Sequence, residues 1–291
     1  MTFRILFTGV TSIHGWPLFE AFSTALLSEN LLGIRSPKMK IPSGPNLFSC
    51  CITDKDRLYT FKKEFKPTHV VHCAGVCDLD VCEERPSWAH MMNAGGSKVI
   101  ADLFGEDCKI VYMSSDLVFS GENSPPSGYD EDCLPDPLSV AGSTIAAAEL
   151  EIKRCAQHLI LRLGLPIGRS VTGTKGACDF IENRLRKKLP ITLFHDEWRS
   201  CILCDDIARA TMELIKLDIF GLYHLGGPQK ASLYEIGEWI RQKNNYDQEY
   251  LKGIMRVEEK IGPPRMGDVS LNSSKVQKVL SFQLANPVFA I

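Results

Sequence analysis

The chain has 291 residues, of which 44% are hydrophobic, so it can bury a substantial core. Its formal net charge of -2 and its pI near 6.4 leave no basic face for nucleic acid. No apolar run approaches the roughly 20 residues that span a bilayer, and the first residues lead directly into a strand. We therefore expect a cytoplasmic protein that binds neither nucleic acid nor membrane.

The first half of the chain alternates short apolar runs with segments of helical periodicity. Fully apolar strands joined by helices are typical of a parallel sheet covered on both faces. The sequence therefore predicts an α/β fold, a Rossmann-type doubly wound parallel sheet with its ligands at the carboxyl ends of the strands. The expected strands are 4–8, 31–34, 69–73, 109–113 and 158–162, and the expected helices are 16–27, 54–64, 87–104 and 142–155.

After Pro166 the pattern becomes less regular and predicts a small, interleaved C-terminal substrate lobe. We expect a dinucleotide-binding Rossmann domain at 1–165 and a mainly substrate-binding lobe at 166–291, with segments near 196–225 returning to the first domain. The residues from Phe194 to Arg199 are expected to form a loop. The other expected elements are helices at 179–188, 205–217, 232–244 and 274–280 and a strand at 222–225.

The eleven cysteines are expected to be reduced thiols, since this chain length and the absence of a signal sequence argue against a disulfide framework. Cys201 and Cys204 form the only pair with metal-like spacing. Without a second such pair, the sequence predicts no metal site, and buried small hydrophobic residues are the better interpretation.

The first chemical signal is Thr8-Gly9-Val10-Thr11-Ser12-Ile13-His14-Gly15, between a predicted strand and a predicted helix. Gly9 and Gly15 permit a tight turn close to a pyrophosphate, whose charge the free N–H groups of the next helix would meet. Ser12 stands at the middle glycine position and partly restricts the approach of the backbone. We predict that Gly9, Ser12, Ile13 and Gly15 bind a dinucleotide, with a bare structural turn as the alternative.

After the second predicted strand, an Asp or Glu would hydrogen-bond the ribose hydroxyls of NAD, but this chain has Arg35-Ser36. A cation and a hydroxyl at these positions suit the additional phosphate of NADP. The sequence therefore favours NADP(H) over NAD(H). The alternative is that Arg35 is a solvated surface charge.

Several further motifs in chain order resemble the extended short-chain dehydrogenases, specifically the dTDP-4-dehydrorhamnose reductase branch, over nearly the whole chain. The most specific is Ser114-Ser115-Asp116-Leu117-Val118-Phe119-Ser120-Gly121. The resemblance implies that Ile52, Ala74 and Gly75 also line the cofactor site. The other matching motifs are His72-Cys73-Ala74-Gly75, Asn93-Ala94, Tyr129-x-Glu131-Asp132, Pro137-Leu138, Gly221-Leu222-Tyr223-His224-Leu225-Gly226-Gly227, and Pro264-Arg265 followed by Asp268-x-x-Leu271.

The catalytic Tyr-x-x-x-Lys of that family is missing from this chain, which has Ala141 and Ile145 at the two positions. In the family, the resemblance implies, the tyrosine donates a proton to the carbonyl while the lysine lowers its pKa and holds the nicotinamide ribose. A positioned acid-base group contributes roughly 10²–10⁴ in rate. Ser115 and Asp116 remain as residual catalytic candidates, with Asp116 as the nearest ionisable proton donor.

Two more ligand-side positions depart from the family pattern: Leu117 replaces a tyrosine that faces the sugar, and Cys51 replaces an Asp near the adenine or its ribose. With Ser12, Ala141 and Ile145, they indicate a pocket whose function is relaxed or redirected. His72, His195 and His224 lie near the predicted cleft, but a lone histidine is more often packed or solvated than catalytic.

Three functions remain open. The first is a reductase-like protein of sugar-nucleotide metabolism that binds NADP(H) and a nucleotide-sugar-like ligand, with Tyr/Lys-dependent reduction lost or severely weakened. The second is a non-catalytic regulatory or scaffold subunit that binds a protein partner, similar in concept to the methionine adenosyltransferase beta subunit. The third is an enzyme redirected to a reaction without hydride transfer. The oligomeric state stays open, with a homodimer as one alternative.

Overall fold

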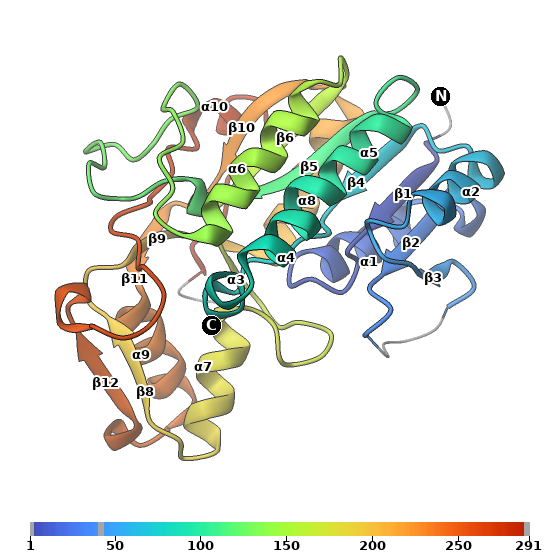
Figure 1. The fold of residues 1–291 in the computed structure, drawn as a ribbon. Helices are drawn as coiled ribbons and strands as arrows, with labels where there is room; N and C mark the ends of the chain where they lie inside the picture. Colours follow the sequence, from blue (N-terminus) through green and yellow to red (C-terminus); the bar gives the residue numbers. More distant parts are fainter. Residues whose placement is uncertain (1–2, 40–43, 288–291) are drawn as a thin grey trace.

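The computed structural model describes residues 3–39 and 44–287, and its centre is a seven-stranded parallel sheet (Figure 1). The strand order is β10-β6-β5-β4-β1-β2-β3, and every neighbouring pair runs parallel. The doubly wound fold predicted from the apolar runs is therefore confirmed. The strands are β1 (Ile5–Thr8), β2 (Leu31–Arg35), β3 (Leu47–Ser49), β4 (His69–His72), β5 (Lys109–Ser115), β6 (His158–Leu163) and β10 (Gly221–Leu225).

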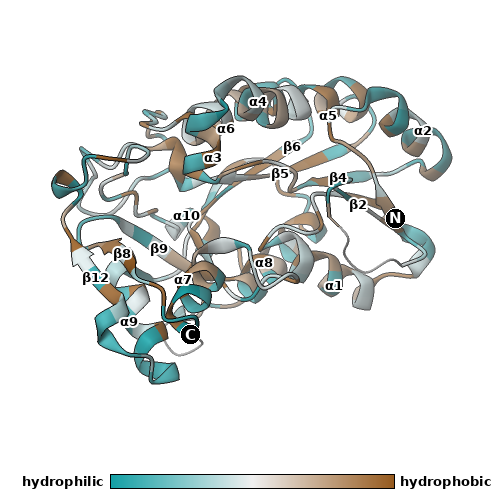
Figure 2. Ribbon diagram, turned by 60° about the horizontal axis from the view of Figure 1, so that its bottom comes forward, coloured by the Kyte–Doolittle hydropathy of each residue, from teal (hydrophilic) through white to brown (hydrophobic). Residues whose placement is uncertain are grey.

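Helices cover both faces of this sheet and bury two separate apolar cores against it (Figure 2). Strand residues alternate between the cores, so Phe7 faces one and Leu6 the other. Such a sheet excludes water from both faces, and its carboxyl edge is left for ligands. One face carries α1 (Gly15–Ala25), α8 (Cys204–Lys216) and α10 (Ser274–Gln277), and the other carries α2 (Lys55–Phe65), α5 (Gly96–Phe104) and α6 (Val140–Lys153).

The strand order reverses between β1 and β4, which lie side by side although β2 and β3 come between them in the chain. In doubly wound sheets this reversal opens a crevice at the carboxyl ends of the two strands. The glycine turn follows β1, and Ala74-Gly75 follows β4. The topology therefore brings two of the predicted cofactor segments to one place.

The chain is helical throughout the predicted range 87–104, but a π-helical segment at Met91–Gly95 divides this helix into α4 (Pro86–His90) and α5. Gly96 comes directly after this segment and lies close to Ile52. A Cβ on Gly96 would be only 2.8 Å from the Ile52 side chain. Single π turns insert one residue into a helix and often occur at functional sites. A shorter helix, α3 (Leu79–Glu84), precedes α4.

The second half forms two smaller sheets. The loop expected from Phe194 to Arg199 is shorter than predicted, because one strand ends at Phe194 and the next begins at Trp198, which leaves residues 195–197 as the connection. The strands are only three to six residues long, too short for a period-2 pattern to stand out. They pack with two helices around their own apolar core. These elements are β7 (Leu165–Ile167), β8 (Ile191–Phe194), β9 (Trp198–Leu203), β11 (Gln229–Ser232), β12 (Leu251–Ile254), α7 (Gly176–Arg186) and α9 (Leu233–Asn244).

Most other helix predictions hold to within a few residues, but the last is too long, since α10 ends at Gln277 rather than near Leu280. Lys278 ends the helix, and the N–H groups of Val279 and Leu280 both turn back to the Val276 carbonyl. The short 3₁₀ turns are η1 (Ser28–Asn30), η3 (Asp116–Val118), η4 (Gln248–Tyr250) and η5 (Arg256–Glu258).

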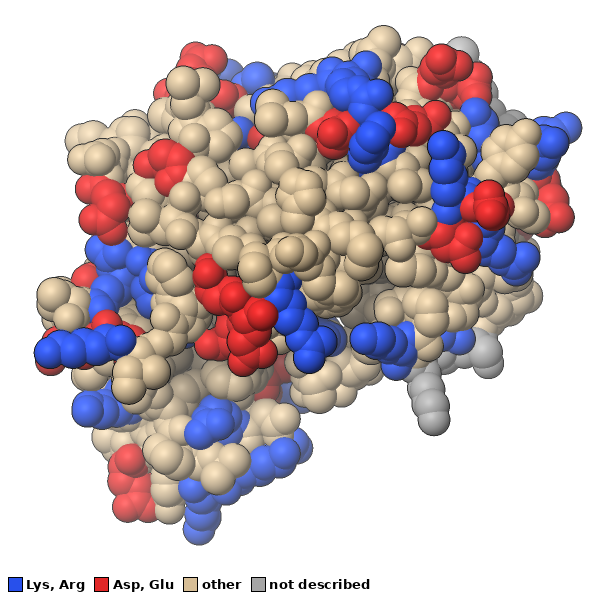
Figure 3. Space-filling view, in the orientation of Figure 1, with Lys and Arg blue, Asp and Glu red and all other residues tan. Residues whose placement is uncertain are grey.

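Positive and negative side chains are interspersed on the face shown in Figure 3, and none of its areas carries a large single-sign patch. This surface agrees with the small net charge of the chain. Within residues 3–39 and 44–287, no helix is both long and apolar enough to cross a membrane.

Candidate functional site

The turn after β1 packs directly against the loop after β4. Gly9 has a φ of +67°, and a Cβ at this position would lie 2.5 Å from the Ala74 backbone nitrogen. Only glycine fits both the left-handed backbone and the close approach. Gly9 therefore holds the predicted turn at the carboxyl ends of β1 and β4, where a dinucleotide would lie in this fold.

Ser12 closes the turn with its own hydrogen bonds. Its backbone N–H donates to the Gly9 carbonyl at 3.0 Å, and its Oγ accepts the Gly15 N–H at 3.0 Å. The backbone N–H groups of Ile13 and His14 make no hydrogen bond among the described residues. Two free donors at the start of an 11-residue helix can hold an anion, so Ser12 reshapes the turn without removing its capacity for phosphate.

Arg35 is the last residue of β2. Its side chain makes one hydrogen bond, in which Nη1 donates to the Met39 carbonyl. Its Nε is buried and has no hydrogen-bond partner in the described part of the chain. Ser36 beside it is exposed. The guanidinium is therefore held in place but keeps an unused hydrogen-bond donor. Such an arrangement favours a role in binding an anionic ligand over that of a solvated surface charge.

Cys51 and Ile52 follow β3 and face different surroundings. The Cys51 Sγ lies 3.1 Å from the Thr53 Oγ1, whereas Ile52 is buried against Gly96. Gly75, next to Ala74, lies beside the carboxamide of Asn93. All the predicted cofactor residues thus come from the turns that follow β1, β2, β3 and β4.

Asn93 is a site residue that our sequence interpretation quoted only as part of a family motif. Its Nδ2 donates to the Val76 carbonyl and to the Thr144 Oγ1, both at 2.8 Å, and its Oδ1 accepts the Val76 N–H at 2.7 Å. The π-helical segment turns this side chain toward the loop after β4. A buried Asn that ties this loop to α6 fixes one wall of the cleft.

The two positions of the missing catalytic pair lie on the first turns of α6 and are buried. Ser139 caps this helix by accepting the Gly142 N–H at 3.1 Å. Ala141 is 0% and Ile145 7% exposed, in an apolar cluster that also contains Leu117. A Cβ at Gly142 would lie 2.1 Å from the Leu117 carbonyl oxygen, so α6 is pressed onto this segment. Ala141 and Ile145 are therefore part of the apolar packing between α6 and this segment.

Asp116 is fully buried and paired with Arg199 of β9. Its Oδ2 accepts the Arg199 Nε at 2.7 Å, and its Oδ1 accepts the Nη2. Burial opposes the charge on Arg199, yet the Asp116 carboxylate raises the pKa of Arg199 above its ordinary value. Both carboxylate oxygens of Asp116 are therefore occupied by the guanidinium of Arg199.

Ser115 is hydrogen-bonded to the same carboxylate. Its Oγ donates to the Asp116 Oδ1 at 3.0 Å and accepts the Leu117 N–H at 3.2 Å. The geometry thus brings the two residual candidates together, but with Asp116 orienting the hydroxyl. Arg199, which lies 83 residues away in the chain, was not among the predicted site residues.

Glu149, three turns along α6, forms a second buried ion pair. Both of its carboxylate oxygens accept from Arg162 of β6 at 2.8 Å, and its Oε1 also accepts the Ser114 hydroxyl at 2.6 Å. Glu149 and Arg162 are each 1% exposed. The Lys153 Nζ lies 3.9 Å away at the helix surface. This buried network joins α6 to β5 and β6 of the sheet.

Two of the three histidines singled out in the sequence occupy packed positions. His72 is fully buried, with its ring nitrogens 2.7 Å from the Thr8 Oγ1 and 3.0 Å from the Ser97 Oγ. His224 is fully buried beside the Tyr129 carbonyl, whereas His195 is exposed and its ring centroid lies 4.2 Å from that of Tyr234. Burial lowers the pKa of His72 to about 3 and that of His224 to about 4.

These buried histidines predict a loss of stability in weak acid. In the unfolded chain they take up protons near pH 6.5, whereas in the folded protein they stay neutral down to about pH 4. Their stabilising contribution is therefore complete above pH 6.5 and is lost as the pH falls toward 4. Each should reduce the free energy of unfolding by about 1.4 kcal/mol per pH unit across this window.

Urea unfolding at closely spaced pH values between 7 and 4.5 would measure this dependence. The variant His72→Gln should lower the slope by about one proton, while His90→Gln, at an exposed position, should leave it unchanged. An identical slope in all three proteins would contradict the assignment.

Cys201 and Cys204 do not form a metal site in the described residues, where no three His, Cys, Asp or Glu side chains gather in a suitable group. Both are buried, and burial raises the pKa of each thiol to about 12. Cys201 lies in β9, and Cys204 begins α8 with its Sγ 3.6 Å from the Ile13 carbonyl. Cys204 therefore packs beside the glycine turn, and Cys201 packs in the apolar core of the smaller sheets.

Comparison with known proteins extends over almost the whole chain. The model of the RmlD substrate binding domain family matches residues 3–287. Methionine adenosyltransferase 2 subunit beta of Xenopus tropicalis is 26% identical over 289 residues, covering 95% of this chain and 82% of that protein. A probable low-salt glycan biosynthesis reductase of Haloferax volcanii is 25% identical over 65% of this chain.

Solved structures show the same fold. A hypothetical dTDP-4-dehydrorhamnose reductase from Sulfolobus tokodaii has a TM-score of 0.79 and 26% identity, with 96% of this chain and 95% of that one covered. The dTDP-4-dehydrorhamnose reductase of Bacillus anthracis, solved in complex with NADP, has a TM-score of 0.84 at 20% identity, with 99% and 97% covered. The resemblance to this reductase branch, predicted from the motifs, is confirmed.

Proposed function

Because this chain belongs to the RmlD substrate binding domain family, we propose that it is a cytoplasmic member that binds NADP(H) but no longer reduces a carbonyl, and that it acts as a subunit of a protein complex. The observation that carries the proposal is the apolar packing at Ala141 and Ile145. The fold is retained, while the two positions that would move a proton are part of a hydrophobic core.

Loss of reduction follows from the groups that remain. The Ser115 hydroxyl donates its only proton to Asp116, and a serine hydroxyl has no useful acidity at neutral pH. Asp116 is committed to Arg199 and orients Ser115. Without a positioned acid, the rate should fall by a factor of about 10²–10⁴ relative to a complete site. A nucleotide-sugar-like ligand would at most be bound near Ser115.

The turn after β1 supports dinucleotide binding. The free N–H groups of Ile13 and His14 would meet the pyrophosphate, and Arg35, with its unpartnered Nε, would meet the additional phosphate of NADP. When bound, this cofactor would supply a hydride, but this chain offers no proton to accompany it. We infer that the dinucleotide acts here as a structural or regulatory ligand.

The variant Arg35→Ser should separate NADPH from NADH. We expect affinity for NADPH to fall at least tenfold, because a charge-assisted contact to phosphate is lost, while affinity for NADH stays within about twofold. Calorimetric titration of both nucleotides would measure this difference. Lys38→Ser, a loss of the same charge from an exposed neighbour, is the control. Two outcomes would contradict the assignment of Arg35: an equal loss of affinity for NADPH and NADH, or an equal loss of NADPH affinity in Arg35→Ser and Lys38→Ser.

Our proposal for the partner rests on the relatives named methionine adenosyltransferase 2 subunit beta. The name describes a subunit, and this chain aligns with 82% of the length of the Xenopus tropicalis protein. We propose that this chain likewise binds a catalytic subunit of a methionine adenosyltransferase. A subunit of this kind needs a stable fold and a surface, but no catalytic pair.

Mixing the purified chain with the methionine adenosyltransferase catalytic subunit of the same source should give a complex of defined stoichiometry in size-exclusion chromatography with light scattering. We expect a changed KM or kcat of that enzyme in the complex.

The full chain assayed with NADPH and 4-keto nucleotide sugars should show no turnover. Turnover of such a sugar, or elution only as a monomer or self-associated dimer, would overturn the proposal.

A further inference from the structure

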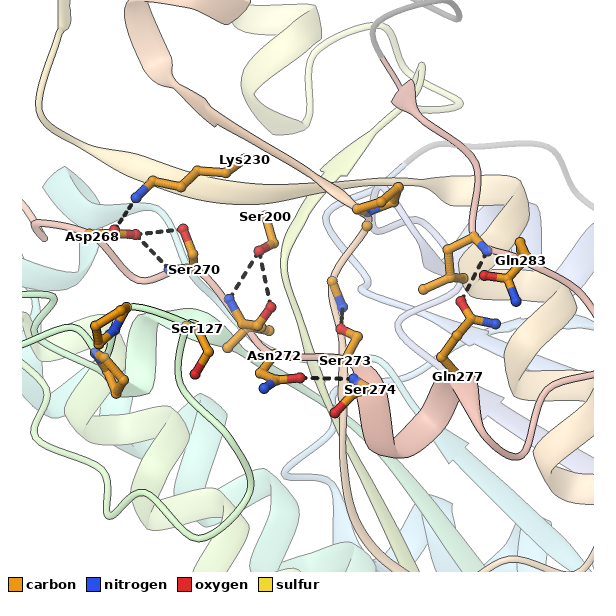
Figure 4. Close-up of a pocket in the computed structure, with 18 residues that line it drawn as sticks. Ser127, Ser200, Lys230, Asp268, Ser270, Asn272, Ser273, Ser274, Gln277 and Gln283 are labelled. Carbon is orange, nitrogen blue, oxygen red and sulfur yellow. Dashed lines mark hydrogen bonds and ion pairs between the residues drawn. The ribbon is translucent and has the colours of Figure 1, made fainter.

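A polar groove lies away from the glycine turn and shares no lining residue with the candidate site described above. It has a volume of about 430 Å³ and lies between the loop that contains Ser127, the segment after β10, and the chain around α10 (Figure 4). Its lining residues are Pro125, Pro126, Ser127, Gly128, Ser200, Gly226, Gly227, Pro228, Lys230, Asp268, Ser270, Leu271, Asn272, Ser273, Ser274, Gln277, Gln283 and Leu284.

The groove carries no net charge. Among the described residues, Lys230 and Asp268 are the only charged ones that line it, and they form an ion pair with each other. Asp268 also accepts hydrogen bonds from the backbone N–H and the hydroxyl of Ser270. Since both charges are already compensated, the groove offers little to a phosphate or a metal cation.

Four polar side chains around this groove retain unused hydrogen-bonding capacity. Ser127, Ser274 and Gln283 make no side-chain hydrogen bond among the described residues. Asn272 uses its Oδ1 to accept the Ser274 N–H at 3.0 Å and keeps its Nδ2 for another partner. Figure 4 shows Ser127 and Gln283 on segments separate from the one that carries Asn272 and Ser274, around the same space. Hydroxyls and amides both donate and accept hydrogen bonds.

The floor of the groove is ordered by contacts within the protein. The Ser200 Oγ accepts the Leu271 N–H at 3.0 Å, and the Ser273 Oγ accepts the Gly226 N–H at 2.8 Å. The Gln277 carboxamide donates to the Phe282 carbonyl at 2.6 Å and accepts the Leu284 N–H at 3.2 Å. A ligand would therefore meet a largely pre-formed surface and lose less free energy to ordering it.

We propose that this groove binds a neutral, polyhydroxylated small molecule of about monosaccharide size. Hydroxyl groups match the four donor-acceptor side chains, and the prolines and Leu284 offer apolar contacts to the ring carbons. The volume lies near the lower end of the usual range for small-molecule sites, roughly 300–1,000 Å³. This site is independent of the dinucleotide and of the protein partner proposed above.

Saturation-transfer difference NMR on the full-length chain would test the groove with D-glucose, D-galactose, L-rhamnose and myo-inositol as neutral probes and with glucose 6-phosphate as a charged one. We expect saturable binding of at least one neutral probe. The variant Ser127→Trp, which fills the groove from an exposed loop position, should weaken this binding at least tenfold, and Asn272→Ala should weaken it several-fold.

Ser87→Trp, an equal substitution at an exposed position of α4, is the matched control and should bind like the parent. Circular dichroism and thermal unfolding would establish that each variant is folded. The proposal is overturned if no neutral probe binds, if the charged probe binds better, or if Ser127→Trp binds as well as Ser87→Trp. None of these outcomes depends on NADPH or on the partner.

Discussion

Restoring the family's catalytic pair, by Ala141→Tyr together with Ile145→Lys, should destabilise the protein rather than return a reductase. Ala141 is completely buried, so a phenol ring has no space and should cost about 1–3 kcal/mol through overpacking. Ile145 belongs to the same apolar cluster, where an unpaired ammonium should cost several kcal/mol more. The sum approaches the whole stability of a typical domain. We expect poor soluble yield and no turnover of 4-keto nucleotide sugars.

The control is Ser143→Lys, which places the same charge at an exposed position of the same helix. It should change the free energy of unfolding by less than about 0.5 kcal/mol in urea titration. If the double variant folds like this control and reduces a keto sugar with NADPH, the pocket is an intact remnant, and the apolar packing does not prevent catalysis.

Removing Glu149 should have a comparably large effect on stability. The substitution Glu149→Ala leaves the Arg162 guanidinium buried without its carboxylate partner. Breaking a buried pair by deletion of one partner costs about 3–5 kcal/mol, because the remaining charge is uncompensated. Chemical unfolding monitored by circular dichroism would measure this loss.

Glu151→Ala is the matched control, since Glu151 lies on the same helix but pairs with Arg154 near the surface. Its loss should cost less than about 1 kcal/mol. Glu149→Gln should fall between the two alanine variants, as it retains the shape and some hydrogen bonds. Equal costs for Glu149→Ala and Glu151→Ala would mean that the buried network does not stabilise the fold.

The doubly wound sheet was predictable because its strands are locally encoded. Runs such as Ile5–Thr8 and Lys109–Ser115 are almost continuously buried, and helices of eleven or more residues separate several of them. β3 was missed because it has only three residues, none of them fully buried. The same difficulty applies to β7 and the other short strands of the second half, whose pairing depends on tertiary packing.

Parts of the candidate site were predictable for a similar reason. Gly9, Ser12 and Gly15 belong to one turn with a fixed position after a strand, and the structure places this turn at the carboxyl end of β1. The partnership of Asp116 with Arg199 joins residues 83 positions apart, and no local pattern indicates it. Nor could spacing show that Asn93 reaches Thr144 across 51 positions.

The ion pair between Asp116 and Arg199 also limits how the molecule can move. It joins the end of β5 in the large sheet to β9 in the three-stranded sheet. A hinge that opened the cleft there would separate two buried charges, at a cost of several kcal/mol. The surface that a partner would contact should therefore keep the same conformation whether or not a nucleotide is bound. Any coupling between nucleotide binding and partner binding would therefore depend on local surface contacts rather than on a hinge motion between the two parts of the protein.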